Sequence, residues 1–267
     1  MKEKYIRIFK RKRVFFLLVV IIFINVMDFL SSNIGEPIYD EVIVQSAWNE
    51  NIIFKGMNSF AGIASSIIVF FLSGVPLADV FVEDKKSAYV NNAVIGHGSY
   101  DKYIWDNYKY NFIFAGFFLL IPFLINMLIW LMIRPIWSMN FINTGMSNRT
   151  LFRSLFSKNT IVFYILHFIK IFLAGGVLAS FIMYLNTKMN SQYLGIIGMI
   201  LIDFLIGMIF GNISSVNSSY ELTSFTFLIG SLQLRGPLLS LIYYSIVLFV
   251  PIIYFKNYAK KLMIWQD

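Results

Sequence analysis

The sequence predicts an all-α, polytopic integral membrane protein, with six transmembrane helices in a single transmembrane domain over residues 1–267. Hydrophobic residues make up 58% of the chain, charged residues only 13%, and the mean hydropathy is +0.71, which is far from the balance of a soluble domain. Apolar runs recur that are long enough to cross a hydrocarbon core of ~30 Å, which takes about 20 helical residues. The chain has room for about six such runs and little else.

Six apolar runs are the expected membrane-spanning helices, and the segment between the second and the third is too charged to sit in lipid. The 28 Phe and 15 Tyr suit lipid contact and interfacial belts. Cysteine is absent, which excludes disulfides, thiolate metal sites and cysteine nucleophiles. The expected spans cover residues 14–30, 57–80, 111–133, 160–185, 194–210 and 237–255.

The basic N-terminus orients the chain. Residues 1–13 carry seven basic side chains and one acid, which suits either a short helix lying on an anionic inner leaflet or a simple positive-inside anchor. The loop at 31–51 holds four acids and no Lys or Arg, so we expect it outside. Alternation then places the 81–108 loop and both termini in the cytoplasm, in agreement with the lysines of the C-terminal tail.

The loop at 134–159 conflicts with this alternation. It holds four basic side chains and no acid, a composition that the positive-inside rule associates with the cytoplasm. Alternation of the spans places it outside, and the conflict stays open.

The polar segment between the second and third spans is the expected contact with a partner. We expect a short helix at 88–95, capped by Asp84 or Ser87 and ended by Gly96-His97-Gly98. Five aromatic residues at 100–110 then lead into the third span as an interfacial belt. The mixed charges suit a docking surface, and they also suit a solvated loop without a partner.

This segment resembles the region between the second and third spans of type-2 ABC transporter permeases. The similarity is carried by ADVFVEDKKSAYVNNAVIGHGSYDKYIWDNY at 78–108, and it is strongest to small Gram-positive members that export peptides or bacteriocins. The acidic-acidic-basic-Lys-Ser run at 83–87 and the later Ser99, Tyr100 and Tyr103 match the family pattern. The six-span layout extends the similarity over nearly the whole chain.

The resemblance implies a type-2 ABC exporter permease fold, with an N-terminal interfacial helix at 1–13, a cytoplasmic coupling helix and an extracellular re-entrant region at 212–236. The chain would be a multi-pass protein of the bacterial plasma membrane, paired with an identical or paralogous permease subunit as a dimer. A separate ATPase subunit would bind ATP and Mg. The expected substrate is hydrophobic or amphipathic, a peptide first, and no nucleic acid is involved.

The coupling loop of the resemblance maps onto nine residues of this sequence. In the family, this loop seats in a groove of the ATPase subunit. The corresponding residues here are Glu83, Asp84, Lys85, Lys86, Ser87, Tyr89, Asn92, His97 and Tyr100.

Four polar residues within the apolar runs are candidates for a translocation path. His167 and Lys170 share one helical face, and Asn126 lies one turn past Pro122. Counted from the starts of their spans at 1.5 Å per residue, Lys170 is roughly 15 Å deep and Asp203 roughly 14 Å. Charges at that depth usually face a partner or a polar cavity. Lys170 and Asp203 are therefore predicted either to line the path or to lock the helices as an ion pair.

Glycines in the fourth and fifth spans predict close helix packing. Small residues let neighbouring backbones approach in a membrane. The glycines concerned are Gly175, Gly176, Gly195, Gly198, Gly207 and Gly211.

Motifs for intrinsic catalysis are absent from the sequence. It contains no G-x-x-x-x-G-K-[ST], H-E-x-x-H or G-x-S-x-G motif, so we expect no enzyme, no metal site and no cofactor in this chain. Three alternatives stay open: an immunity or scaffold protein without an ATPase that binds a peptide in the membrane, an ion-coupled carrier, and an intramembrane enzyme built on His167, Lys170 and Asp203. No convincing inverted repeat supports a carrier.

Overall fold

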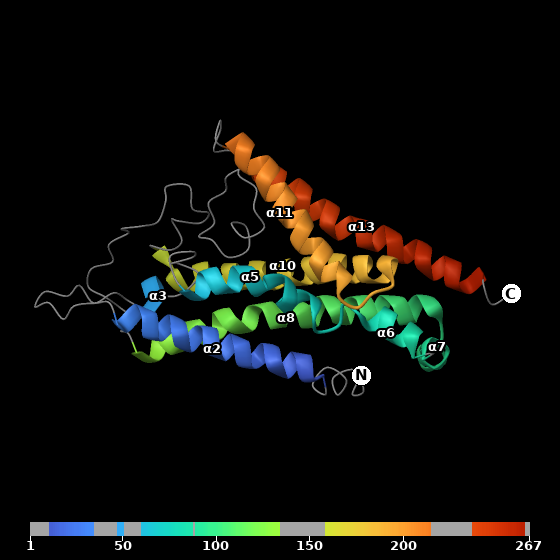
Figure 1. Cartoon of the computed structure of the whole chain (residues 1–267), viewed down its shortest axis with the longest axis horizontal. Helices are drawn as coiled ribbons and strands as arrows, with labels where there is room; N and C mark the ends of the chain where they lie inside the picture. Colours follow the sequence, from blue (N-terminus) through green and yellow to red (C-terminus); the bar gives the residue numbers. More distant parts are fainter. Residues whose placement is uncertain are drawn as a thin grey trace, which may run out of the picture.

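The computed structural model describes residues 11–34, 47–50, 60–87, 89–133, 158–214 and 237–264. Every regular element in these ranges is an α-helix (Figure 1). Three earlier expectations fall wholly or mostly outside the described residues: the interfacial segment at 1–13, the basic loop at 134–159 and the re-entrant region at 212–236.

Among the described helices, three are long and apolar enough to cross a membrane, judged by length and composition. They are α2 (Lys12–Ile34), α8 (Tyr100–Ile133) and α10 (Thr160–Met189). Shorter apolar stretches lie in α11 (Leu194–Ser214) and α13 (Pro237–Ile264). The described part of the chain is therefore all-helical and membrane-associated.

The remaining helices are shorter. With 15 residues, α5 (Phe60–Gly74) is roughly 22 Å long at 1.5 Å per residue. The others are α3 (Ala47–Glu50), α6 (Val80–Lys86) and α7 (Val90–His97). In Figure 1, α6 and α7 lie at one end of the bundle, beyond the end of α5.

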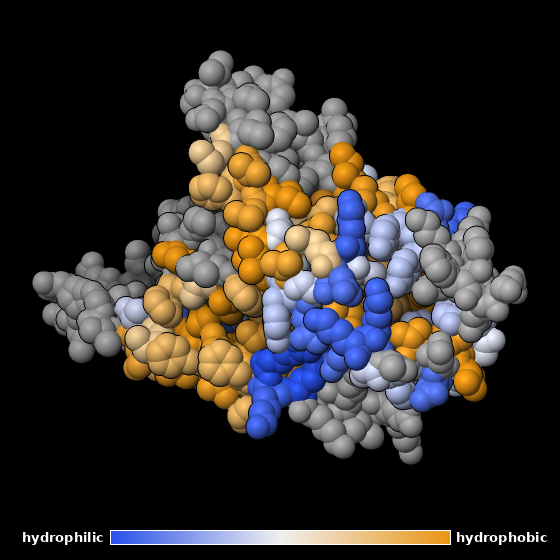
Figure 2. Space-filling view, turned by 45° about the vertical axis from the view of Figure 1, so that its right-hand side comes forward, coloured by the Kyte–Doolittle hydropathy of each residue, from blue (hydrophilic) through white to orange (hydrophobic). Residues whose placement is uncertain are grey.

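The helix α10 lies at the centre of the bundle, packed against α5, α8, α11 and α13. Its residues Leu178, Ala179, Ile182 and Met183 are fully buried, so neighbours surround it at this level. On the face seen in Figure 2, the described surface is apolar over much of its area, whereas hydrophilic side chains gather in a separate patch. On α2, large apolar side chains are exposed at Phe15, Phe16, Val19, Ile22, Phe23 and Val26.

Close packing at the predicted glycines is confirmed where their surroundings are described. A Cβ on Gly175 would lie 2.9 Å from the Ala115 carbonyl oxygen of α8, and one on Gly195 would lie 2.5 Å from the Ile182 carbonyl oxygen. Neither site has room for a side chain. Small residues thus bring α10 against both α8 and α11.

Segments far apart in the sequence meet at one end of the bundle (Figure 1), where buried polar side chains join them. We define this polar end as residues 11–13, the stretch 75–99, and the α10–α11 junction at 186–195. Hydrogen bonds join all three parts, for example Arg11 to Asp79 and Asn186 to the Ala78 carbonyl. The C-terminal half of α13 also reaches this end, where Phe255 packs on Phe81 at 5.3 Å between ring centroids.

The segment after α5 differs from the expectation of one capped helix. Helix α5 ends at Gly74 rather than at residue 80, and two short helices, α6 and α7, follow. Ser87 ends α6, with its hydroxyl donating to the Glu83 carbonyl at 2.9 Å, so it does not cap α7. Asp84 lies within α6, and the N-cap position of α7 is Tyr89, with no side-chain cap.

The predicted end of α7 is confirmed. Gly98 adopts a left-handed backbone with φ of 83°, and its N–H donates to the Val94 carbonyl at 2.9 Å. Glycine adopts this conformation without a Cβ clash. Helix α8 then begins at Tyr100, eleven residues before the span expected at 111. The Ser99 hydroxyl accepts from the Lys102 N–H at 3.2 Å and caps this start, so the aromatic residues at 100–110 are helical.

Candidate functional site at the polar end

The α6–α7 segment presents an exposed surface at the polar end. Ile95 is 78% exposed and Tyr89 46% exposed, and Lys85, Lys86 and Asn92 of the same segment are exposed as well. Aromatic and aliphatic side chains among charges are typical of contact surfaces. This face of the segment is therefore available to a partner.

The nine predicted coupling residues divide between this surface and the interior. The exposed members are Lys85, Lys86, Ser87, Tyr89 and Asn92. Asp84 and Tyr100 are buried, whereas Glu83 and His97 are half-buried. The run at 83–87 is thus not a single docking strip, because its acids turn inward and its lysines turn outward.

Two inward contacts hold the segment on α8. The Asp84 carboxylate accepts a hydrogen bond from the Tyr103 hydroxyl at 2.7 Å. His97 Nε2 lies 4.0 Å from an Asp106 carboxylate oxygen, and its ring packs on Tyr103 with centroids 5.6 Å apart. These contacts join both α6 and α7 to the first two turns of α8.

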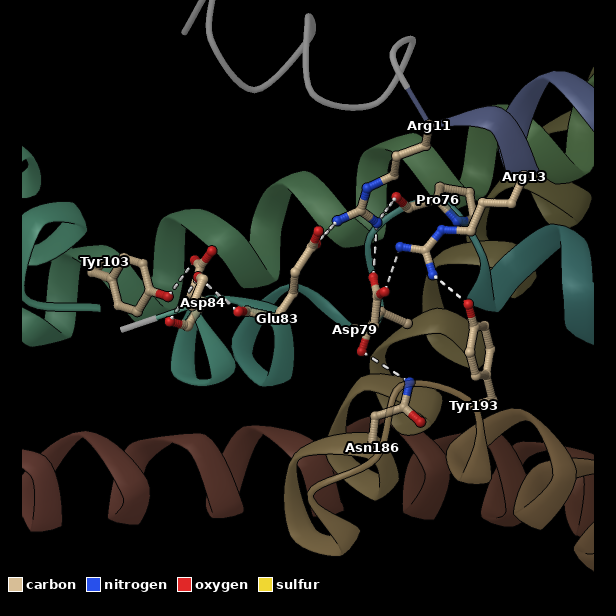
Figure 3. Close-up of polar contacts among 11 residues, drawn as sticks. Arg11, Arg13, Pro76, Asp79, Glu83, Asp84, Tyr103, Asn186 and Tyr193 are labelled. Atoms are coloured by element: carbon tan, nitrogen blue, oxygen red, sulfur yellow. Dashed lines mark hydrogen bonds and ion pairs between the residues drawn. The ribbon is translucent and has the colours of Figure 1, made fainter. Parts of the chain in front are cut away.

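A second set of contacts holds the turn at 75–79, which joins α5 to α6. Arg11, just before α2, donates to the Pro76 carbonyl at 2.9 Å, to Asp79 at 2.8 Å, and to Glu83 (Figure 3). Arg11 is 9% exposed. A buried guanidinium needs acceptors of this kind, since an unpaired buried charge is costly.

Arg13 completes the binding of Asp79. It donates to the other carboxylate oxygen at 2.5 Å, so both oxygens of Asp79 are used by arginines of the same helix start. Its other terminal nitrogen lies 3.5 Å from the Tyr193 hydroxyl, at the junction of α10 and α11 (Figure 3). The two arginines and the two acids Asp79 and Glu83 leave this network without net charge.

Asn186 ties the α10–α11 junction to the same turn. Its side-chain amide donates to the Ala78 carbonyl at 3.1 Å and accepts from the Gly195 N–H at 2.7 Å. The residue is fully buried. The end of α10, the start of α11 and the 75–79 turn are therefore joined through one side chain.

This network was not predicted from the sequence. The basic N-terminus was expected to be a helix on the inner leaflet or a positive-inside anchor, and Asp79 was expected inside a span. A signal was present: Asp79 and the N-terminal basic residues were all expected near the same membrane surface, with opposite charges. Which of seven basic side chains would pair with Asp79 was not predictable from spacing.

Asn126, a predicted path residue, instead belongs to a buried contact between helices. Its amide donates at 2.9 Å to Asp28, a fully buried acid on α2. The other oxygen of Asp28 accepts from the Ala61 N–H at the start of α5, also at 2.9 Å. Asp28 was not among the predicted site residues, although an acid within an apolar run is itself a signal.

The three remaining candidates lie on α10 and α11. His167 is buried, with Nδ1 2.9 Å from the Phe163 carbonyl oxygen. Lys170 and Asp203 are half-buried. From the shared junction, Lys170 is roughly 29 Å along α10 and Asp203 roughly 14 Å along α11, so straight antiparallel helices would offset them by roughly 15 Å. Their pairing stays a prediction.

Within the described ranges, no group of three His, Asp or Glu side chains is placed to hold a metal ion. No protein-family model, curated protein or solved structure matches the chain. What the protein does has to be inferred from its residues and their geometry.

Proposed function

We propose that this chain is the membrane-spanning permease subunit of an ATP-binding cassette exporter. One observation carries the proposal: the α6–α7 segment exposes a mixed apolar and charged face, while its opposite face is bound to α8 and to the network around Asp79. A segment that receives force from a partner has to be accessible to that partner and firmly joined to the helices it moves. The α6–α7 segment meets both conditions.

The arrangement of the helix ends supports a six-span topology. The start of α2, the α5–α6 turn, the α10–α11 junction and the end of α13 gather at the polar end (Figure 1). If α2, α5, α8, α10, α11 and α13 alternate in direction across a membrane, these are the ends that meet on one side. The basic residues near both termini favour the cytoplasm for that side.

The energy source would lie outside this chain. The sequence has no P-loop, so a separate ATPase subunit would bind ATP with Mg and dock on Lys85, Lys86, Tyr89, Asn92 and Ile95. A second permease subunit, identical or paralogous, would complete the path in the bacterial plasma membrane. Hydrophobic or amphipathic peptides are the first substrate class, an expectation that rests on the resemblance alone.

Co-purification tests the proposal. The native complex is extracted in mild detergent, and every co-purifying chain is identified by mass spectrometry. The docking variants are Lys86→Glu and Tyr89→Ala, both at exposed positions. Lys188→Glu is the matched control, because it reverses another exposed lysine at the polar end. Asp84 is unsuitable as a docking variant, because its carboxylate is buried against Tyr103.

We expect a P-loop ATPase to co-purify with the wild type and with Lys188→Glu, and not to co-purify with either docking variant. The absence of any ATPase under gentle conditions, from protein with intact helical circular dichroism, would contradict the permease assignment. A peptide-binding immunity or scaffold protein, or an ion-coupled carrier, would then take its place.

A further inference from the structure

The α6–α7 segment is joined to the bundle by two separate routes. One route runs directly to α8, through Asp84 with Tyr103 and His97 with Asp106. The other runs through the 75–79 turn to α2 and to the α10–α11 hairpin. The two routes use different residues, so each can be interrupted while the other is left in place.

The second route converges on Asp79. Both of its oxygens accept from arginines at the start of α2, at 2.8 and 2.5 Å, and the residue is 1% exposed. The carbonyl of the preceding residue, Ala78, accepts from Asn186 of α10. A shift of this turn would therefore break contacts to α2 and to α10 together, unless those helices move with it (Figure 3).

We infer that Asp79 is a positioning residue that passes a displacement of α6–α7 to α2 and to the α10–α11 hairpin. The mechanical role rests on the proposed function, whereas the link itself rests on the contacts around Asp79 alone. Buried ion pairs are screened much less by salt than exposed ones, so the Arg11–Asp79 pair depends little on ionic strength. Arg13 extends it to Tyr193 at the start of α11.

Distances between spin labels test this inference directly. The chain contains no cysteine, so pairs of introduced cysteines are the only labelled sites. A label at the exposed Asn92 on α7 is paired in turn with Lys12 on α2, Lys188 on α10 and Lys102 on α8, all exposed. The protein is measured in lipid nanodiscs, without any partner.

The test variants are Asp79→Asn and Arg13→Gln. Arg13→Gln is the milder change, because Asp79 keeps its bond to the Arg11 side chain, and it serves if Asp79→Asn fails to fold. The matched control is Lys109→Gln, which removes an exposed charge from α8.

In Asp79→Asn we expect the Asn92–Lys12 and Asn92–Lys188 distance distributions to broaden roughly twofold, because the loss of one partner breaks a buried ion pair. Arg13→Gln keeps the Arg11–Asp79 pair, so the same two distributions should broaden by less. The Asn92–Lys102 distribution, which follows the first route, and all three distributions of Lys109→Gln should stay narrow. Unchanged distributions for Lys12 and Lys188 would overturn the inference. Equal broadening of all three would also overturn it, since Asp79 would then support only the overall fold.

The labels need no ATPase, so failure of this inference is distinguishable from failure of the proposed function. Broadening without a co-purifying ATPase would uphold the Asp79 link and reject the exporter. A co-purifying ATPase with unchanged distributions would uphold the exporter and reject the link.

Discussion

The Tyr103 hydroxyl donates a hydrogen bond to the Asp84 carboxylate at 2.7 Å, and this bond joins α6 to α8. Both residues are buried, at 2% exposed each. A buried carboxylate needs hydrogen-bond donors, since its desolvation is otherwise uncompensated. Asp84 therefore acts in the assembly of the polar end, although the run that contains it had indicated a docking residue.

Replacing Tyr103 with Phe should destabilise the protein. The change removes a donor to a buried charged acceptor, a loss of about 1–3 kcal/mol. Thermal unfolding in detergent, followed by circular dichroism, measures it. Tyr89→Phe removes the same hydroxyl from an exposed residue and should leave the midpoint unchanged. Equal midpoints for the two variants would show that the Asp84–Tyr103 bond adds no stability.

Asp28→Ala should weaken the contact of α2 with the start of α5. The Asp28 carboxylate accepts from the Ala61 N–H at the start of α5, where a negative charge also interacts favourably with the helix dipole. Loss of an N-cap acceptor costs about 0.5–2 kcal/mol. Hydrogen exchange at the α5 amides should rise in Asp28→Ala and not in Met27→Ala, a change at an exposed neighbour. Equal hydrogen-exchange rates at the α5 amides of Asp28→Ala and Met27→Ala would contradict the capping role of Asp28.

Gly175→Ala should separate α8 from α10. The added Cβ would meet the Ala115 carbonyl oxygen and Leu119 Cβ, both at 2.9 Å, and overpacking of this kind typically costs about 1–3 kcal/mol. The midpoint temperature of thermal unfolding measures this loss of stability. Gly96→Ala is the matched control, because its Cβ would meet nothing within 4 Å and alanine favours a helix by roughly 0.5–1 kcal/mol. A Gly175 variant as stable as the Gly96 variant would refute the close packing.

Asp79→Asn should cost more stability than Arg13→Gln. The first change leaves the buried Arg11 without Asp79, the more buried of its two carboxylate partners, and breaking a buried pair costs about 3–5 kcal/mol. The second leaves Asp79 bound to Arg11 and removes a side chain that is 25% exposed. Urea titration of both variants gives their free energies of unfolding and hence the order of the two losses. The reverse order would contradict a stabilising role for the buried Arg11–Asp79 pair.

Several features were predictable from local sequence because their causes are local. The apolar composition determines that the chain is membrane-associated. The end of α7 at Gly98 follows from the backbone that glycine allows, and the tight packing at Gly175 follows from the missing side chain. The helix expected at 88–95 is present as α7, whereas the additional helix α6, which buries Val80, Phe81 and Val82, was not expected.

The polar network was decided by the tertiary structure. Arg11 and Arg13 lie 68 and 66 residues from Asp79 in the chain, and no periodicity or spacing relates positions so far apart. Whether Asp84 and Asn126 face a partner, a path or another helix depends on which helices pack beside them. Composition and turn chemistry by themselves determined a helical membrane protein with a polar segment at one end. Only the packing of α2, α8 and α10 against that segment decided which of its side chains are buried, because burial is a property of neighbours distant in sequence.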